Sequence, residues 1–340
     1  MENSIKNLKI SNFKSIREAE LECGRVNLFV GKPNVGKSNV LEALSLLGSN
    51  YSTSKKFMSE FIRYKNIRNC FFYNDIENDL SVRADDKFAG LIYNPTDSGF
   101  FEFTSNFNQN EKNEEFEYAT IEQSGNILSK KMATFSSVKY YLFKQNPTVN
   151  AVSNNLFLTP PYGNNLSLVV QSFGKLSNEI SNFFEEYNLE FVIDVVKRQF
   201  EIQRKIGNVV HKIDYHLIAD TLQRIIFYYA AIYSNKGSVI LFEEPEAHSF
   251  PPYVRELALK ISESIDNQYF ITTHSPHLLT TLIEETPEEE LAIFITYFEK
   301  FETKFKKLNS EEISELLNYR IDIFFNQRWF LNEESAQNPA

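Results

Sequence analysis

The segment VNLFVGKPNVGKSN, residues 26–39, constrains the fold more than any other part of the chain. A mostly apolar run, residues 26–30, enters a turn of the form Gly-x-x-x-x-Gly-Lys-Ser, and a helical pattern leaves it. Strand, turn and helix in this order form the context of a phosphate-binding P-loop. The segment therefore predicts an α/β fold that binds a nucleotide.

Each residue type in this turn meets a physical need. Gly31 and Gly36 let backbone N–H groups point at phosphate oxygens, where a Cβ would block the approach. Lys37 reaches the β- and γ-phosphates, and Ser38 offers a hydroxyl to Mg²⁺. The positive end of the following helix strengthens the field on the phosphates. We therefore expect ATP and Mg²⁺ as ligands, bound by Gly31, Lys32, Pro33, Asn34, Val35, Gly36, Lys37, Ser38 and Asn39.

The composition of the chain limits which partners and which cellular compartment are to be expected. The net charge of −10 argues against a broad surface that coats nucleic acid, but it leaves a local basic groove open. Cys23 and Cys70 lie far apart without metal-ligand spacing, which suits a reducing compartment. The longest wholly apolar run, residues 225–233, is too short to span a bilayer, and residues 1–10 lack the apolar region of a signal peptide. We expect a cytoplasmic protein with no membrane partner.

A second group of polar residues follows another apolar run. Residues 239–242 lead into Glu243 and Glu244, a pattern typical of a buried strand that ends at the carboxyl edge of an open α/β sheet. We expect Glu243 to hold Mg²⁺, mostly through water, and Glu244 to orient and deprotonate the attacking water. The alternative is a surface acidic pair that caps the next helix. Four apolar residues directly before the pair, and a P-loop in the same chain, favour the catalytic interpretation.

The remaining pattern predicts further elements. Two short strands are expected within residues 5–23, a helix over residues 57–64, and a hairpin around Gly207 and Asn208. Short alternating runs between residues 80 and 121 predict an antiparallel sheet. The tail is expected to hold one strand, residues 291–297, and one helix, residues 310–318.

Several phrases resemble one family of ATPases. These phrases are LKISNFKSIREAELE, GKPNVGKSN, IADTLQR, VILFEEPEAHSFPPYV and ITTHSPHLL. They are similar to the OLD/RecF-like branch of ABC-type ATPases found in bacterial defence modules, and among these to the ATPase subunits of PARIS anti-phage systems. The resemblance implies one ABC-type ATPase domain over residues 1–340, with a mixed central sheet flanked by helices plus an antiparallel β subdomain. Residues 1–50 and 157–330 would form the nucleotide-binding core, and residues 51–156 an inserted β-rich and helical subdomain.

The resemblance also assigns further site residues. His274 resembles the switch histidine that hydrogen-bonds the γ-phosphate, and imidazole suits this task because it can donate or accept near neutral pH. A structural histidine is the alternative. Gln145 is the candidate for a metal-contacting glutamine, although a solvated surface glutamine explains it as well. The segment that contains Ala219, Asp220, Thr221 and Arg224 lies in the place of the ABC signature, which binds the other subunit's nucleotide, but it contains no glycine.

The same resemblance implies partners. It predicts a homo-oligomer, at least a dimer that sandwiches ATP, which holds a separate toprim-type nuclease and releases it when a phage-encoded trigger is sensed. Only about sixty residues follow the predicted strand before His274, fewer than a toprim domain needs, so we expect the nuclease on another chain. Two alternatives stay open. One is a RecF/SMC-like DNA-repair ATPase that binds duplex DNA in an ATP-dependent way, and the other is a transporter ATPase subunit.

Overall fold

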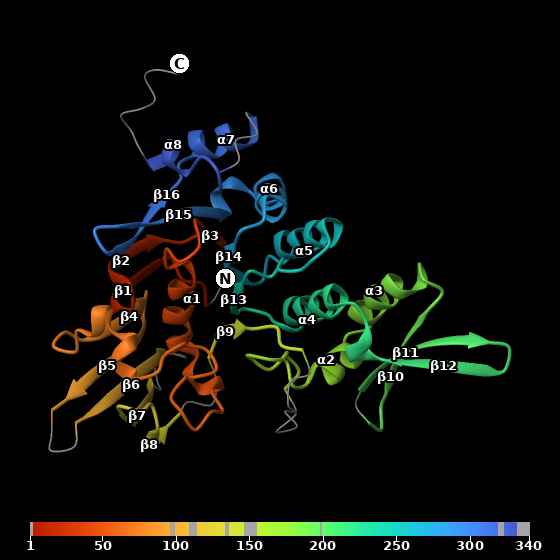
Figure 1. Cartoon of the computed structure of the whole chain (residues 1–340), viewed down its shortest axis with the longest axis horizontal. Coiled ribbons are helices and arrows are strands. Elements are labelled where there is room, and N and C mark those ends of the chain that lie inside the picture. Colours follow the sequence, from red (N-terminus) through yellow and green to blue (C-terminus); the bar gives the residue numbers. More distant parts are fainter. Residues whose placement is uncertain are drawn as a thin grey trace.

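A six-stranded mixed sheet, in the order β16-β15-β3-β14-β13-β9, lies in the middle of the molecule (Figure 1). β16 runs antiparallel to β15, and all other neighbouring strands are parallel. The structure, a computed structural model, describes residues 3–95, 99–108, 114–132, 136–145, 155–197, 199–318 and 323–331. The strands of the central sheet are β3 (Val26–Val30), β9 (Val138–Tyr141), β13 (Val239–Glu243), β14 (Gln268–Thr273), β15 (Leu291–Glu299) and β16 (Glu302–Lys307).

The strand that leads into the P-loop, β3, is buried along its whole length between β14 and β15. Its alternate side chains enter two different cores, as the two-residue period of a strand requires. Leu28 packs with residues of the helices on one face, and Phe29 packs on the other face with its ring 5.1 Å from that of Phe294. β3 therefore joins both layers of the molecule.

Helices cover both faces of the central sheet. α1 (Lys37–Ser45) begins inside the P-loop and continues as the short helix η1 (Leu46–Tyr51); its buried residues Val40 and Leu44 share a core with Phe29. The opposite face is covered by α4 (Asp220–Ser234), α5 (Pro251–Glu263) and α6 (Pro276–Glu285). Further helices are α7 (Ser310–Asn318), α8 (Gln327–Leu331), and the short η2 (Ile67–Cys70), η3 (Phe72–Asn74), η4 (Tyr215–Leu217) and η5 (Glu288–Glu290).

A seven-stranded antiparallel sheet, in the order β2-β1-β4-β5-β6-β7-β8, packs beside α1. The two strands expected ahead of the P-loop are confirmed as β1 and β2, and β1 pairs with β4. The N-terminal strands thus share a sheet with strands of the 51–156 segment, whereas β9 of that segment joins the central sheet. The strands are β1 (Asn7–Phe13), β2 (Ile16–Glu22), β4 (Leu80–Ala84), β5 (Lys87–Asn94), β6 (Phe100–Asn108), β7 (Glu114–Glu122) and β8 (Ile127–Lys131).

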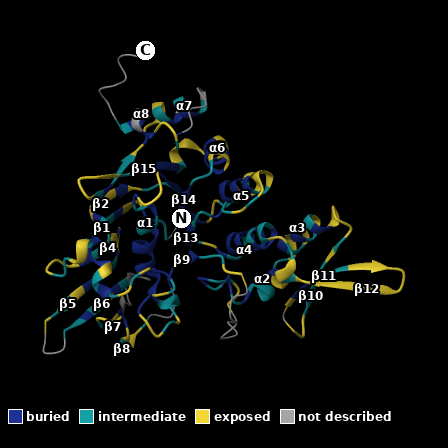
Figure 2. Ribbon diagram, viewed as in Figure 1, coloured by how far each residue is buried: buried dark blue, intermediate teal, exposed yellow. Residues whose placement is uncertain are grey.

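A third, smaller sheet projects from the helical side of the molecule (Figure 1). The hairpin expected around Gly207 is confirmed, with Gly207 at φ 58° in the turn. Phe200 and Ile202 anchor the sheet in the core, while every residue of β12 is exposed (Figure 2). This part of the chain holds α2 (Leu166–Ser172), α3 (Gly174–Glu185), β10 (Glu190–Asp194), β11 (Gln199–Ile206) and β12 (Val209–Asp214).

Two expectations need correction. Residues 57–64 form turns rather than a helix, because Met58 adopts a φ of 49° and the Glu60 carboxylate accepts hydrogen bonds from the side chain and backbone of Thr53. The tail contains a second strand, β16, which pairs with β15 and was not predicted. Among the described residues, no helix combines the length and apolar character needed to cross a membrane.

We expect Phe29→Ala to lower the free energy of unfolding by about 3–5 kcal/mol, because it removes a buried ring from the strand that joins both layers. Urea denaturation followed by circular dichroism measures this change. Phe301→Ala is the matched control: its ring is 75% exposed, so the urea midpoint should move little. Equal losses in the two variants would contradict the central place given to β3.

Candidate nucleotide-binding site

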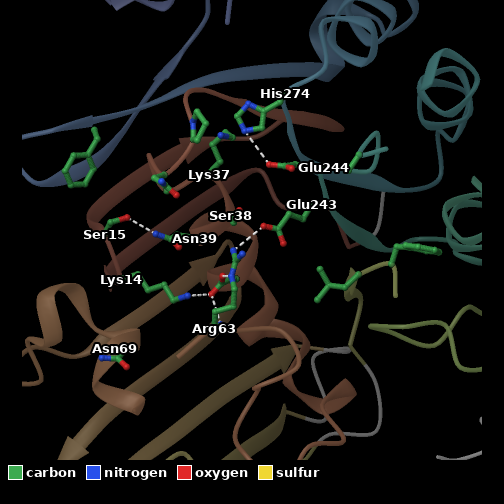
Figure 3. A pocket seen from close by; sticks show the side chains of 18 of the residues that line it. Lys14, Ser15, Lys37, Ser38, Asn39, Arg63, Asn69, Glu243, Glu244 and His274 are labelled. Carbon is green, nitrogen blue, oxygen red and sulfur yellow. Dashed lines mark hydrogen bonds and ion pairs between the residues drawn. The ribbon is translucent and has the colours of Figure 1, made fainter. Parts of the chain in front are cut away.

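A cavity of about 950 Å³ opens at the carboxyl ends of β3, β13 and β14 (Figure 3). It brings together residues that the sequence separates by more than two hundred positions, because parallel neighbouring strands end at the same edge of the sheet. Of the residues expected at the site, the following line it: Pro33, Asn34, Gly36, Lys37, Ser38, Asn39, Arg224, Glu243, Glu244 and His274.

The two glycines of the P-loop are required by packing as well as by the approach of phosphate. Gly36 has a φ of 97°, a conformation that residues with a Cβ rarely adopt. A Cβ on Gly36 would lie 2.2 Å from Thr303 Oγ1, and one on Gly31 would lie 2.2 Å from the backbone oxygen of Thr296. The hairpin of β15 and β16 therefore presses directly on the loop.

A chain of side-chain hydrogen bonds fixes the loop from behind. Thr303 Oγ1 donates to the backbone oxygen of Val35 at 2.8 Å and lies 2.6 Å from Ser15 Oγ. Asn39 Nδ2 donates to the same Ser15 oxygen at 2.7 Å. The loop is thus held between the β1–β2 turn and β16, so its shape does not depend on the nucleotide alone.

Lys37 is buried, with 5% of its surface exposed. Its Nζ donates to the backbone oxygens of Gly31 and Lys32, at 2.9 Å in each case. Burial lowers the pKa of Lys37 to about 8, against the opposing influence of three nearby carboxylates, chiefly that of Glu244. The ammonium group therefore spans the loop, where phosphates would replace its carbonyl partners.

Glu243 is held by two residues that the sequence did not single out. Its Oε1 accepts from Arg63 Nη2 at 3.2 Å (Figure 3). Its Oε2 accepts from the hydroxyl of Tyr140 at 2.9 Å. Arg63 also donates through Nε to Glu42 at 2.8 Å, and Glu42 forms a further ion pair with Lys14. Nothing in the surrounding sequence marks Arg63, because its segment has no motif and its contacts are all distant along the chain.

Glu244 and His274 face each other across the ends of β13 and β14 (Figure 3). Glu244 Oε1 lies 3.4 Å from His274 Nε2. Burial lowers the pKa of His274, as does the neighbouring Lys37, while Glu244 raises it. His274 therefore favours the neutral imidazole at neutral pH, which can both donate and accept a hydrogen bond.

The segment in the place of the signature lies at the start of α4, directly after Ala219. Asp220 accepts from Arg224 at 2.8 Å and from Gln145 at 2.9 Å. Thr221 donates its hydroxyl to the backbone oxygen of His248 at 2.8 Å, which ties the segment to the loop after β13. Gln145 thus pairs with this segment, and its expected contact with a metal stays a prediction.

The donor set fits Mg²⁺ that arrives with a nucleotide. Within the ranges that the structure describes, no cluster of three or more His, Cys, Asp or Glu side chains could hold a metal ion. Mg²⁺ is usually bound through one or two protein oxygens together with substrate phosphates and water. Ser38 and Glu243, which line the same cavity as the P-loop, supply such a partial set.

Comparisons with known proteins bear on the family and the fold of the chain. The model of the AAA_21 family, described as "AAA domain, putative AbiEii toxin, Type IV TA system", matches residues 26–280, the range from β3 to α6. "Uncharacterized protein MJECL10" of Methanocaldococcus jannaschii is 34% identical over 107 residues, which are 28% of this chain and 49% of that protein. The chain thus spans about half the length of the curated relative that it matches.

Two solved structures share the fold. The Smc head bound to the C-terminal winged-helix domain of ScpA has a TM-score of 0.52 at 15% identity, covering 90% of this chain and 98% of that one. The Pyrococcus furiosus Smc head with an extended coiled coil has a TM-score of 0.51 at 14% identity, covering 93% and 99%. The likeness shows the fold alone, and it confirms the expected α/β fold with a mixed central sheet.

Raising the pH above about 8 should weaken nucleotide binding, because Lys37 loses its charge near its pKa of about 8. Below that pH the affinity should be level, and above it the affinity should fall by up to about tenfold per unit. Titration with a fluorescent ATP analogue in Mg²⁺ between pH 7 and 9.5 measures the effect. Lys37→Arg is the control, because guanidinium keeps its charge and any remaining binding should be independent of pH. A dissociation constant of the wild type that stays level to pH 9.5 would contradict the lowered pKa of Lys37.

Proposed function

The chain belongs to the AAA_21 family of AAA domains, and from this premise we propose that it binds ATP with Mg²⁺ and hydrolyses it to ADP and phosphate. One observation carries the proposal: Glu244 and His274 lie 3.4 Å apart on the wall of the cavity that also holds Lys37 and Ser38. A carboxylate and a neutral imidazole at the ends of neighbouring strands are suited to hold a water molecule and a terminal phosphate.

The residues of the site divide the task. Lys37 and the N–H groups of the P-loop bind the phosphates, and Ser38 and Glu243 hold the metal ion. Mg²⁺ would neutralise charge on the phosphate oxygens. Glu244 accepts a proton from the attacking water, and His274 hydrogen-bonds the γ-phosphate.

We further propose that two copies close over ATP. The start of α4, with Ala219, Asp220 and Thr221, would present N–H groups to the partner's nucleotide, as helix N-termini do for anions. Arg224 lines the cavity of its own chain, with its guanidinium 4.6 Å from the ring centre of Phe143, which supports a role toward the nucleotide in cis.

Glu244→Gln should keep ATP binding and lower the turnover number by roughly 10²- to 10⁴-fold, because it removes the general base and preserves the shape of the side chain. The steady-state rate of phosphate release at saturating ATP measures the effect. Glu256→Gln on α5 is the matched control. Because Glu256 lies outside the cavity, this variant should hydrolyse ATP at the wild-type rate. A Glu244→Gln enzyme as fast as the wild type would assign the base to another residue.

The cellular role that we propose is that of a sensor and scaffold in anti-phage defence. The ATPase would hold a separate toprim-type nuclease and release it on contact with a phage-encoded trigger. Two findings support this role: the resemblance of the motifs to defence ATPases, and the family description, which names a toxin of a type IV toxin–antitoxin system. Release would follow from a difference in affinity between the ATP-closed and open states.

The purified chain should therefore cleave neither DNA nor RNA with Mg²⁺ or Mn²⁺, and a nuclease encoded beside its gene should co-purify with it. Glu244→Gln should keep ATP bound, whereas Lys37→Ala should not bind it. Comparing the nuclease that co-purifies with each variant therefore compares the ATP-bound and the nucleotide-free complex. Cleavage that follows the protein through purification and survives in both variants would contradict a separate nuclease. ATP-dependent binding of duplex DNA with a steep salt dependence would favour the DNA-repair alternative instead.

A further inference from the structure

Glu246 accepts hydrogen bonds from the end of β14, next to His274, yet its side chain does not line the nucleotide cavity. It lies in the loop between β13 and α5, two residues after Glu244. Its Oε1 accepts from Thr273 Oγ1 at 2.6 Å and from the backbone N–H of His274 at 2.8 Å. One carboxylate oxygen thus joins the loop after β13 to the end of β14.

The backbone on both sides of this contact is held by further hydrogen bonds. The loop is a series of tight turns: Glu244 has a φ of 43°, and the N–H of Ala247 donates back to the oxygen of Glu244 at 3.0 Å. β13 and β14 are joined at the same edge by the Glu244 N–H, which donates to the backbone oxygen of Thr272 at 3.0 Å. Beyond that bond the chain turns toward α6, and the bonds to Glu246 hold the first residue after β14.

The carboxyl group of Glu246 is buried, and only one of its two oxygens accepts hydrogen bonds from the described residues. Burial raises its pKa, while the bonds from Thr273 and His274 lower it. Its second oxygen, Oε2, is buried and has no hydrogen-bond partner within the described parts of the chain. Burying a carboxyl group with one unpaired oxygen costs free energy of folding. The two hydrogen bonds that Oε1 accepts offset this cost, and we take them as the reason for a glutamate at this position.

We propose that Glu246 is a positioning residue that acts through His274. By accepting from the His274 N–H and the Thr273 hydroxyl, it holds the imidazole 3.4 Å from Glu244 and against the cavity. The inference rests on the proposed ATPase function, and it extends the site to a residue whose side chain does not line the nucleotide cavity. An acceptor at Oε1 is the property required, and Gln supplies it as well as Glu.

The test compares Glu246→Ala, Glu246→Gln, His274→Ala and the double variant Glu246→Ala/His274→Ala. Glu246→Ala should lower kcat by roughly tenfold to a hundredfold, the effect of a small misplacement of a reacting group, with KM changed by less than about threefold. Glu246→Gln should restore kcat to within about threefold of the wild type. The double variant should be no slower than His274→Ala alone, because Glu246 acts only through the imidazole that the His274 change already removes.

Two outcomes would overturn the proposal. Losses that multiply in the double variant would show that Glu246 acts independently of His274, and a Gln variant as slow as the Ala variant would show that the acceptor is not its contribution. Glu256→Ala, a change of another glutamate on the adjoining helix α5, is the matched control and should leave kcat unchanged. Thermal melting of each variant establishes that it is folded.

A second measurement does not depend on hydrolysis. The chain has only five histidines, so the imidazole proton signals can be assigned by comparison with His274→Gln in nuclear magnetic resonance spectra. The His274 signal should shift in Glu246→Ala and stay in place in Glu246→Gln, without nucleotide. If the wild type fails to hydrolyse ATP, the proposed function fails while this comparison still decides the positioning role. A His274 signal that is unmoved in Glu246→Ala would overturn that role.

Discussion

The parallel pairing of β3 with β14 on one side and β15 on the other is the interaction on which the rest of the structure depends. Parallel strands end at a common edge, so this pairing sets the P-loop and His274 side by side, and the pairing of β14 with β13 adds the two glutamates. β3 is buried on both faces, and a shift of register by one residue would exchange Leu28 and Phe29 between two different cores. The geometry of the candidate site is therefore fixed by hydrophobic packing at some distance from its polar residues.

Charged side chains of both signs gather around this edge of the central sheet. Glu42, Glu243, Glu244 and Glu246 lie near the cations Lys14, Lys37 and Arg63. The cations are distributed so that Glu42 receives two of them and Glu243 one, whereas Glu244 faces only His274 among the ion pairs of the described residues. Glu244 thus lacks a lysine or arginine partner among these ion pairs, unlike Glu42 and Glu243, which agrees with the role of a base that we propose for it.

Local sequence pattern encodes only some parts of this site. The P-loop, the strand ending in Glu243 and the strand before His274 are continuous segments, and the structure places them in one cavity as expected. Thr303, Arg63 and Glu246 were missed because each acts through residues that the sequence does not connect to it. The same limit explains the incorrect helix at residues 57–64, where the contacts of Glu60 override local helical preference, and the missing β16, whose mixed polar sequence suits an edge strand.

The hydrogen bond from Thr303 to Val35 joins residues 268 positions apart, and this separation affects the order in which parts of the protein can fold during translation. The P-loop strand is made early, but its two parallel neighbours and the threonine that secures the loop emerge on the order of 10 to 50 seconds later at common rates of translation. A nascent chain can complete the antiparallel strands β1, β2 and β4 to β8 in that interval, since their partners are near in sequence. The competence to bind a nucleotide is then acquired late in synthesis, so an incomplete polypeptide has the motif without the site.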